Sequence, residues 1–266
     1  MASFSVVSNI ASANAQANLS INNVGLQRSL NRLSSGFRIN YSGDDAAGLA
    51  VANGYRSDVA VLNQGIRNAN DGLSTLQIKD GALNNISTLL DRLATLASQS
   101  ASSAFNGSRD TLNAEFVAIV GEIDRESSVA GLNTVQQFSV FVGSGSTVGG
   151  TIGMVTSGAT SLALSGVGIA TDATAKSAIA LISSAVSILG SVQGSIGTLE
   201  NRLQFAVALG QSQVVNTKGA ESRIRDANVA EESANMTRYN ILNQSGIAVL
   251  AQANQSSSAV LSLLRG

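Results

Sequence analysis

The sequence contains no cysteine, no histidine, no proline and no tryptophan. Without cysteine and histidine the chain has no disulfide, no thiol nucleophile, no imidazole base and none of the commonest metal ligands. Enzymes of the zinc, serine-triad and cysteine-dyad kinds are therefore close to excluded, and only carboxylate chemistry stays open. We expect no catalytic residue, no cofactor and no metal site.

Aromatic residues make up only 4% of the chain, although 44% of its residues are apolar. The apolar fraction is mostly alanine, valine, leucine and isoleucine, which favours helices packed along a seam over a core of bulky side chains. The absence of proline lets such helices run without kinks. This composition predicts a mainly α protein, a long antiparallel helical bundle or coiled coil.

Charge is also scarce, with a formal net charge of -1. A nucleic-acid partner would require a basic surplus, so none is expected. We find no polybasic run and expect no apolar stretch to span a bilayer, which argues against membrane insertion. The first twenty residues lack the basic and apolar regions of a cleaved secretory signal. This indicates a cytosolic protein, or one exported by another route.

Composition divides the chain into three zones. Residues 1 to about 130 and about 172 to 266 have helical periodicity, with predicted helices over about 45–100, 109–127 and 174–217. The zone between them is rich in glycine, serine and threonine. Its stretches "QFSVFV" and "TSLALSGV" alternate in polarity, which predicts one or two β-hairpins over about 138–170.

Both chain ends carry weak heptad patterns surrounded by small and polar residues. A helix pair made from the ends would bury little apolar area, worth only a few kcal/mol at about 25 cal/mol per Å². The conformational entropy lost when these residues become ordered costs more than this burial gains. We infer that the ends order when they pack against other copies, and tails without a role are the alternative. The residues predicted to pack in the terminal coiled coil are Val7, Ile10, Ile21, Val24, Met236, Ile247, Leu250, Leu261 and Leu264.

The stretch "GDDAAG" places Asp44 and Asp45 directly before a predicted long helix. A calcium loop would need alternating oxygen ligands and a later acidic residue, which are missing. A phosphate loop would need a lysine, and none lies nearby. One of the two aspartates is therefore expected to cap the helix and to complement its dipole.

Residues 218–238 alternate arginines with acidic residues where two helical patterns meet. Two interpretations stay open. The charges form a solvated helical face, or they form ion pairs with the first charged stretch or with a neighbouring subunit, a geometry that suits arginine.

Three stretches resemble bacterial flagellins. The segment "LQRSLNRLSSGFRINYSGDDAAGLAV" is similar to their N-terminal signature, and "SRIRDANVAEESANMTRYNILNQSGIAVLAQANQSSSAVLSLLRG" is similar to their C-terminal one. The segment "IRNANDGLSTLQIKDGALNNISTLLDRLATLASQSA" matches the helix that follows the first signature. Together the matches cover most of residues 1–130 and 172–266, in the family's order.

The resemblance implies a structural subunit of the bacterial flagellar filament, a secreted and extracellular protein that assembles into a helical homo-oligomer for motility. It implies export in an unfolded state by the flagellar type III apparatus, and an export chaperone, a filament cap and junction proteins as partners. The family's fold implies an inner coiled-coil domain from residues 1–42 and 223–266, and an outer rod domain from residues 43–222. The short middle zone suggests a minimal form without large outer domains.

The charged stretches fall where the family joins its inner and outer helices. The residues expected at this joint or at the subunit interface are Arg28, Arg32, Arg38, Asp44, Asp45, Arg223, Arg225, Asp226, Glu231 and Glu232. Phe37 and Tyr41 stand where smaller residues are common in the family. The resemblance also implies a patch that contacts other subunits in the filament and is read on monomers by an animal innate-immune receptor. Its matching positions are Arg92, Leu96 and Glu122.

The alternatives to a filament subunit are a junction protein of the same family and an enzyme. A hook–filament junction protein shares both ends but forms only a short ring of subunits. Some flagellins carry a zinc protease domain, but its His-Glu-x-x-His ligand set cannot exist in a chain without histidine. A carboxylate-based glycosidase would need a pocket-forming region, and none is evident.

Overall fold

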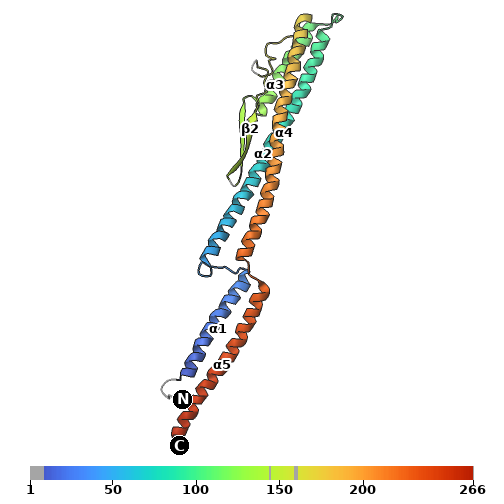
Figure 1. Ribbon diagram of the computed structural model, residues 1–266. Coiled ribbons are helices and arrows are strands. Elements are labelled where there is room, and N and C mark those ends of the chain that lie inside the picture. The colour runs from blue at the N-terminus through green and yellow to red at the C-terminus, as the bar shows by residue number, and fades with distance from the viewer. Residues whose placement is uncertain (1–8, 144, 159–160, 266) are drawn as a thin grey trace. The chain divides into compact units, whose positions relative to one another are not determined.

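The computed structural model describes residues 9–143, 145–158 and 161–265, with the helical backbone but no side chains given for 256–265. The chain is mainly helical with one small antiparallel hairpin, so the predicted fold class is confirmed (Figure 1). Its elements are α1 (Ile10–Ser35), α2 (Ala46–Ser100), α3 (Arg109–Val129), β1 (Gln136–Gly143), β2 (Ser146–Ile152), α4 (Asp172–Arg225) and α5 (Val229–Arg265). The prediction ended the fourth helix too early, because the i,i+4 pair of Glu221 and Arg225 supports helix beyond Gly219.

The chain divides into two compact units. One comprises residues 1–57 and 216–266, so it brings both chain ends together, and the other comprises residues 58–215. We call them the terminal unit and the central unit.

The central unit is held by an apolar stripe on each long helix. On α2 the buried positions advance by alternating steps of three and four residues, through Leu76, Leu83, Leu90 and their neighbours. They pack with α3 and with a matching stripe on α4 into one core. This spacing keeps one face of each helix towards the others over many turns. The α2 stripe continues past Asp80 and Ser87 because Lys79 and Ile86 occupy its buried positions there.

Lys79 is therefore a cation at a core position. Its Nζ donates to the carbonyl of Gly131 at 3.2 Å and to Oε1 of Gln136 at 2.7 Å, so it fastens the start of β1 to α2. Burial lowers the pKa of Lys79, because the charged ammonium loses water.

The hairpin pairs β1 with β2 in antiparallel register, with Val140 opposite Val148. It rests on α2 at Gly65 and Gly72, where a Cβ would overlap the Val142 carbonyl or the Val140 side chain. The two glycines are seven residues apart, so they lie on one face of the helix and form a seat for the strand.

The second hairpin, suggested by "TSLALSGV", is not formed: the described residues between Ile152 and Asp172 contain no strand. Leu162, Leu164 and Ile169 are buried in the core instead. The segment is fixed by side chains of α3, since Asp124 accepts bonds from the backbone and hydroxyl of Ser157 at 2.7 and 2.6 Å. Turn formation with these anchors overrides the alternating pattern.

We predicted that no apolar stretch is long enough to span a bilayer. This prediction is wrong, because α4 is long and apolar enough by length and composition. An 18-residue window of α4 has mean hydropathy 1.6, so this helix passes a test of length and composition that core helices of soluble proteins also pass. In this chain Ile182, Leu189 and Ile196 of α4 lie in the core of the central unit.

A pH dependence follows from Glu200 on α4. Burial raises the pKa of its carboxyl, and the negative charge of Asp80 raises it further. The folded state therefore binds the Glu200 proton more tightly than the unfolded state does, and this binding stabilises the fold. The stabilisation is complete below the ordinary glutamate pKa of about 4.3 and is lost as pH rises through the pKa of the folded state. Glu200→Gln should therefore raise the melting temperature at neutral pH. The difference should disappear in acid, as thermal melts over a pH series would show.

Candidate functional site

The terminal unit contains the residues predicted for the joint and for the terminal coiled coil, and α1 and α5 lie side by side in it (Figure 1). Their contact follows a heptad seam. On α1 the seam consists of the buried or half-buried residues Ser12, Ala15, Leu19, Asn22, Leu26, Ser29 and Leu33. Its members on α5 are Glu232, Met236, Tyr239, Asn243, Gly246, Leu250 and Ala253.

Small residues set the packing of this seam. The ring of Tyr239 lies against Gly25, and Leu19 lies against Gly246. Polar groups complete it, since the Asn243 side chain donates to Asn23 at 2.9 Å and Ser12 donates to Asn254 at 3.0 Å. Large side chains of one helix therefore pack against small residues of the other.

The predicted terminal seam is only partly the observed one. Met236 and Leu250 lie on it, but Ile10 and Ile21 are 64% and 67% exposed, and Val24 and Ile247 are exposed as well. As contacts within one chain these four are wrong. Glycine, alanine and serine allow a closer helix approach than isoleucine does, so the pair forms through the small face.

The exposed residues of α1 form a second stripe on its far side. Ala17 is two residues from Ala15 and from Leu19, so it lies about 200° around the helix from these seam residues. Ile10 and Val24 are each seven residues, or two turns, from Ala17 and therefore lie on the same side of the helix as Ala17. We call Ile10, Ala17, Ile21 and Val24 the outer stripe. Val7 lies outside the described residues, as do the side chains of Leu261 and Leu264.

Two connectors join the helices beside the seam. α1 ends at Gly36, whose φ of 76° is left-handed and whose N–H donates to the Arg32 carbonyl at 2.9 Å. Phe37 then pairs with Asp226 in an antiparallel bridge. The Arg38 N–H donates to the Arg225 carbonyl at 2.7 Å, and the Ala227 N–H donates to the Gly36 carbonyl at 2.9 Å. Backbone hydrogen bonds thus link the connector between α1 and α2 to the connector between α4 and α5. We call residues 36–45 and 226–228 with these partners the connector cluster.

Arginine side chains strengthen the connector cluster. The Arg225 guanidinium lies 4.2 Å from the centre of the Phe37 ring, a cation–π contact. Arg38 donates through Nη2 to the Ile224 carbonyl at 2.7 Å. Arg32 pairs with Glu232 at 3.0 Å between Nη1 and Oε1, and only 9% of the Glu232 side chain is exposed. The second carboxylate oxygen of Glu232 is buried, and no described residue donates a hydrogen bond to it.

The two adjacent aspartates have structural roles. Asp45 accepts a bond from the Gly48 N–H at 2.9 Å at the start of α2, which confirms the predicted cap. Asp44 accepts from the Asn40 N–H at 3.2 Å and so closes the turn before it. No group of three or more acidic side chains suited to a metal ion occurs among the described residues.

The structure assembles only some of the predicted joint residues. Arg32, Arg38, Asp44, Asp45, Arg225, Asp226 and Glu232 all contact the connectors or each other. Arg28, Arg223 and Glu231 form no ion pair within the described part of the chain. Residues 218–238 therefore combine the two interpretations of their charges: some side chains form ion pairs, and others form a solvated helical face.

Sequence reasoning missed Asn228 and the role of Phe37. The Asn228 side chain accepts from the N–H groups of Ala230 and Glu231 at 3.2 and 3.4 Å, and so caps α5. The signal was present, because Asn228 is followed three residues later by Glu231, the spacing of a capping box. The Phe37 contact had no local signal, since its partner lies far away in sequence.

Asp45→Ala should lower the stability of the folded chain by about 1 kcal/mol, because the Gly48 N–H loses its acceptor. Asp45→Asn is the matched control: its amide oxygen caps equally well, so stability should be retained. Thermal melts compare the three proteins. Equal loss in both variants would mean that the charge, and not the hydrogen bond, is what matters.

The predicted receptor patch is wrong at Leu96. This side chain is 1% exposed in the core of the central unit, where the stripe of α2 requires a leucine. Arg92 is exposed and pairs with Glu115 at 2.6 Å. Glu122 is partly exposed and pairs with Arg125 at 2.5 Å, and this hydrogen bond lowers the pKa of Glu122.

The fold and the site together define an α-helical structural protein whose two ends pair and present apolar residues outward. Residues 6–140 match the bacterial flagellin N-terminal helical region, and residues 179–264 match the bacterial flagellin C-terminal helical region. The chain therefore belongs to the bacterial flagellin family and is a structural protein rather than an enzyme.

Two relatives align with nearly the whole chain, and a solved structure aligns with more than half of it. A flagellin of Halalkalibacterium halodurans is 38% identical over 268 residues, covering 97% of this chain and 98% of that protein. The flagellar filament 33 kDa core protein of Treponema phagedenis is 34% identical over 283 residues, with 97% and 98% covered. The crystal structure of Bacillus cereus flagellin has 25% identity and a TM-score of 0.47, and it covers 58% of this chain and 94% of that one.

Proposed function

We propose that this chain is the structural subunit of a flagellar filament and that copies assemble through the faces of α1 and α5 that point away from their mutual seam. The exposed outer stripe of α1 carries this proposal. Family membership and the named filament relatives support it.

Charge distribution supports the same surface. Residues 10–27 and 239–264 contain no charged side chain, while charged residues cluster at 28–56 and 218–238. An uncharged helix pair with exposed isoleucine and valine is poorly suited to remain in water and well suited to burial against further copies. Because the α1 and α5 faces differ, the contact between copies is heterologous and generates an open helical polymer when the rotation does not close.

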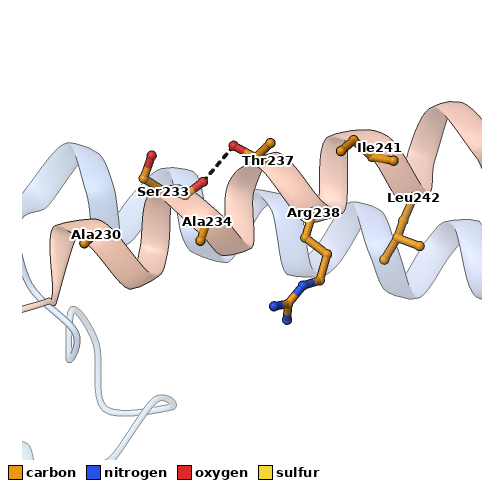
Figure 2. A pocket seen from close by; sticks show the side chains of 7 residues that line it. All are labelled: Ala230, Ser233, Ala234, Thr237, Arg238, Ile241 and Leu242. Carbon is orange, nitrogen blue, oxygen red and sulfur yellow. Dashed lines mark hydrogen bonds between the residues drawn. The ribbon is translucent and has the colours of Figure 1, made fainter.

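The outer face of α5 offers a complementary recess, lined by Ala230, Ser233, Ala234, Thr237, Arg238, Ile241 and Leu242 (Figure 2). The Thr237 hydroxyl donates to the Ser233 carbonyl of the preceding turn at 2.9 Å, so it presents its methyl group outward. Figure 2 shows Ser233, Thr237 and Ile241 along one edge of the helix and Ala230, Ala234, Arg238 and Leu242 along the other, so most of the lining is small or apolar. A side chain of a second copy fits such a surface.

Further expectations from the family belong to the same proposal. We infer that the chain is exported unfolded, with an export chaperone, a filament cap and junction proteins as partners. We infer an inner domain of residues 1–42 and 223–266 and an outer domain of 43–222. The terminal unit, which joins 1–57 to 216–266, supports the pairing of both ends with somewhat different bounds. Exposed Arg92 and partly exposed Glu122 remain the proposed receptor and filament contacts.

Polymerisation of the purified chain tests the proposal. Monomer added to sheared filament fragments should elongate them without limit, as seen by electron microscopy. A junction protein would add a short terminal ring and stop. Failure to add to any fragment would overturn the filament role.

A further inference from the structure

The sequence contains two Asn-Gly dipeptides in opposite structural settings. Asn53-Gly54 lies inside α2, whereas Asn106-Gly107 lies in the irregular segment between α2 and α3. Both asparagines are exposed to solvent. Water therefore reaches both side chains, and they differ in backbone freedom.

Asparagine before glycine is chemically reactive. The backbone nitrogen of the glycine attacks the side-chain carbonyl carbon, and the new C–N bond closes a five-membered succinimide. The bond from that carbon to the side-chain amide nitrogen breaks, and this nitrogen leaves as ammonia with the proton that the glycine nitrogen gives up. Water then opens either carbonyl of the ring and gives aspartate or isoaspartate. Glycine favours the step because it has no Cβ to hinder the required backbone rotation.

The helix suppresses this reaction at Asn53. There the Gly54 N–H is held in the helical hydrogen-bond ladder, and the helical dihedrals keep it away from the Asn53 side chain. Among the described hydrogen bonds, the Asn106 amide and the Gly107 N–H take no part, although their neighbours Phe105 and Thr111 donate to Ser102 and Ser108.

Packing requires the glycine in the exposed segment. A Cβ at position 107 would lie 2.5 Å from Cζ of Phe105, because the ring rests on the glycine. The Arg109 guanidinium covers this ring at 5.7 Å from its centre and donates to the Ser100 and Ser102 carbonyls. A larger residue at position 107 would therefore displace the Phe105 ring.

We propose that Asn106 is a spontaneous modification site, which converts to aspartate and isoaspartate in the folded protein while Asn53 is protected. The product carries a new carboxylate two residues before Ser108, the N-cap of α3. A negative charge at this place complements the helix dipole, so the aspartate form keeps its fold. The isoaspartate form has one additional methylene in the backbone, which displaces the Phe105 ring.

The full-length folded chain is incubated in warm, mildly alkaline buffer and sampled over time. Peptide mapping by mass spectrometry follows both dipeptides, and enzymatic methylation of isoaspartate identifies that product. Asn106 should react at least about tenfold faster than Asn53, which corresponds to about 1.4 kcal/mol for the local opening that Asn53 needs. Asn106→Gln should remove the signal from its peptide and leave the Asn53 peptide unchanged.

The same incubation in strong denaturant is the control for intrinsic reactivity, and there the two rates should converge. Equal rates in the folded chain, or an Asn106 that stays intact while Asn53 reacts, would overturn the proposal. Asn106→Asp reports the effect of the product, and it should melt at the temperature of the unmodified chain.

Discussion

Ile21→Glu is expected to abolish filament formation and to leave the monomer folded. Ile21 is 67% exposed in the single chain, so the substitution removes no contact that the monomer makes. Surface substitutions of this kind change stability by about 0.5 kcal/mol or less. In a filament, the same carboxylate would be buried on an uncharged face without a partner, and several kcal/mol would be lost at each subunit contact.

The matched control is Gln16→Glu, which adds the same charge to the same helix. Gln16 is exposed and follows Ala15 of the seam, so it lies on the flank beside α5 and off the outer stripe. Sedimentation and electron microscopy after salt-induced polymerisation should show filaments for this variant and monomer for Ile21→Glu. Long filaments from Ile21→Glu would remove the outer stripe from the assembly surface.

The sequence predicted the helices because their signal is periodic and long. The stripe from Val59 to Leu90 repeats over many turns, and only burial against other helices explains such a repeat. It also predicted the cap at Asp45, because short polar residues before an apolar helix have one common use. The family signatures then supplied the pairing of the two ends.

The remaining features depend on contacts between distant residues. The terminal seam was assigned to the larger apolar residues, but Gly25 and Gly246 form the contact because they admit Tyr239 and Leu19. Phe37 contributes to the connector cluster through its cation–π contact with Arg225, a residue far from it in the sequence. The stretch "TSLALSGV" alternates as a strand does, yet Asp124 and the core bind it in another conformation. Local patterns do not contain these partners.

Arg32→Met should be the most destabilising single change in the connector cluster. It leaves the Glu232 carboxylate, with 9% of its side chain exposed, without its cation. Breaking one partner of a buried pair costs about 3–5 kcal/mol. Since 30% of the Arg32 side chain reaches solvent, water weakens the penalty and the lower end of this range is expected. Chemical denaturation followed by circular dichroism measures it, and loss of α1–α5 pairing should also reduce polymerisation.

The double variant Arg32→Met with Glu232→Leu separates the ion pair from the packing. If the penalty comes from a buried unpaired charge, removing the glutamate as well restores much of the stability, because two apolar side chains of similar volume replace a costly desolvated pair. The orphaned second oxygen of Glu232 strengthens this expectation, since the pair is incompletely satisfied even in the native chain. Arg225, paired to Glu221 at 3.9 Å, gives a comparison within the cluster, and Glu221→Gln should cost less than 1 kcal/mol. A double variant as unstable as Arg32→Met would show that the loss of stability does not come from the unpaired charge of Glu232.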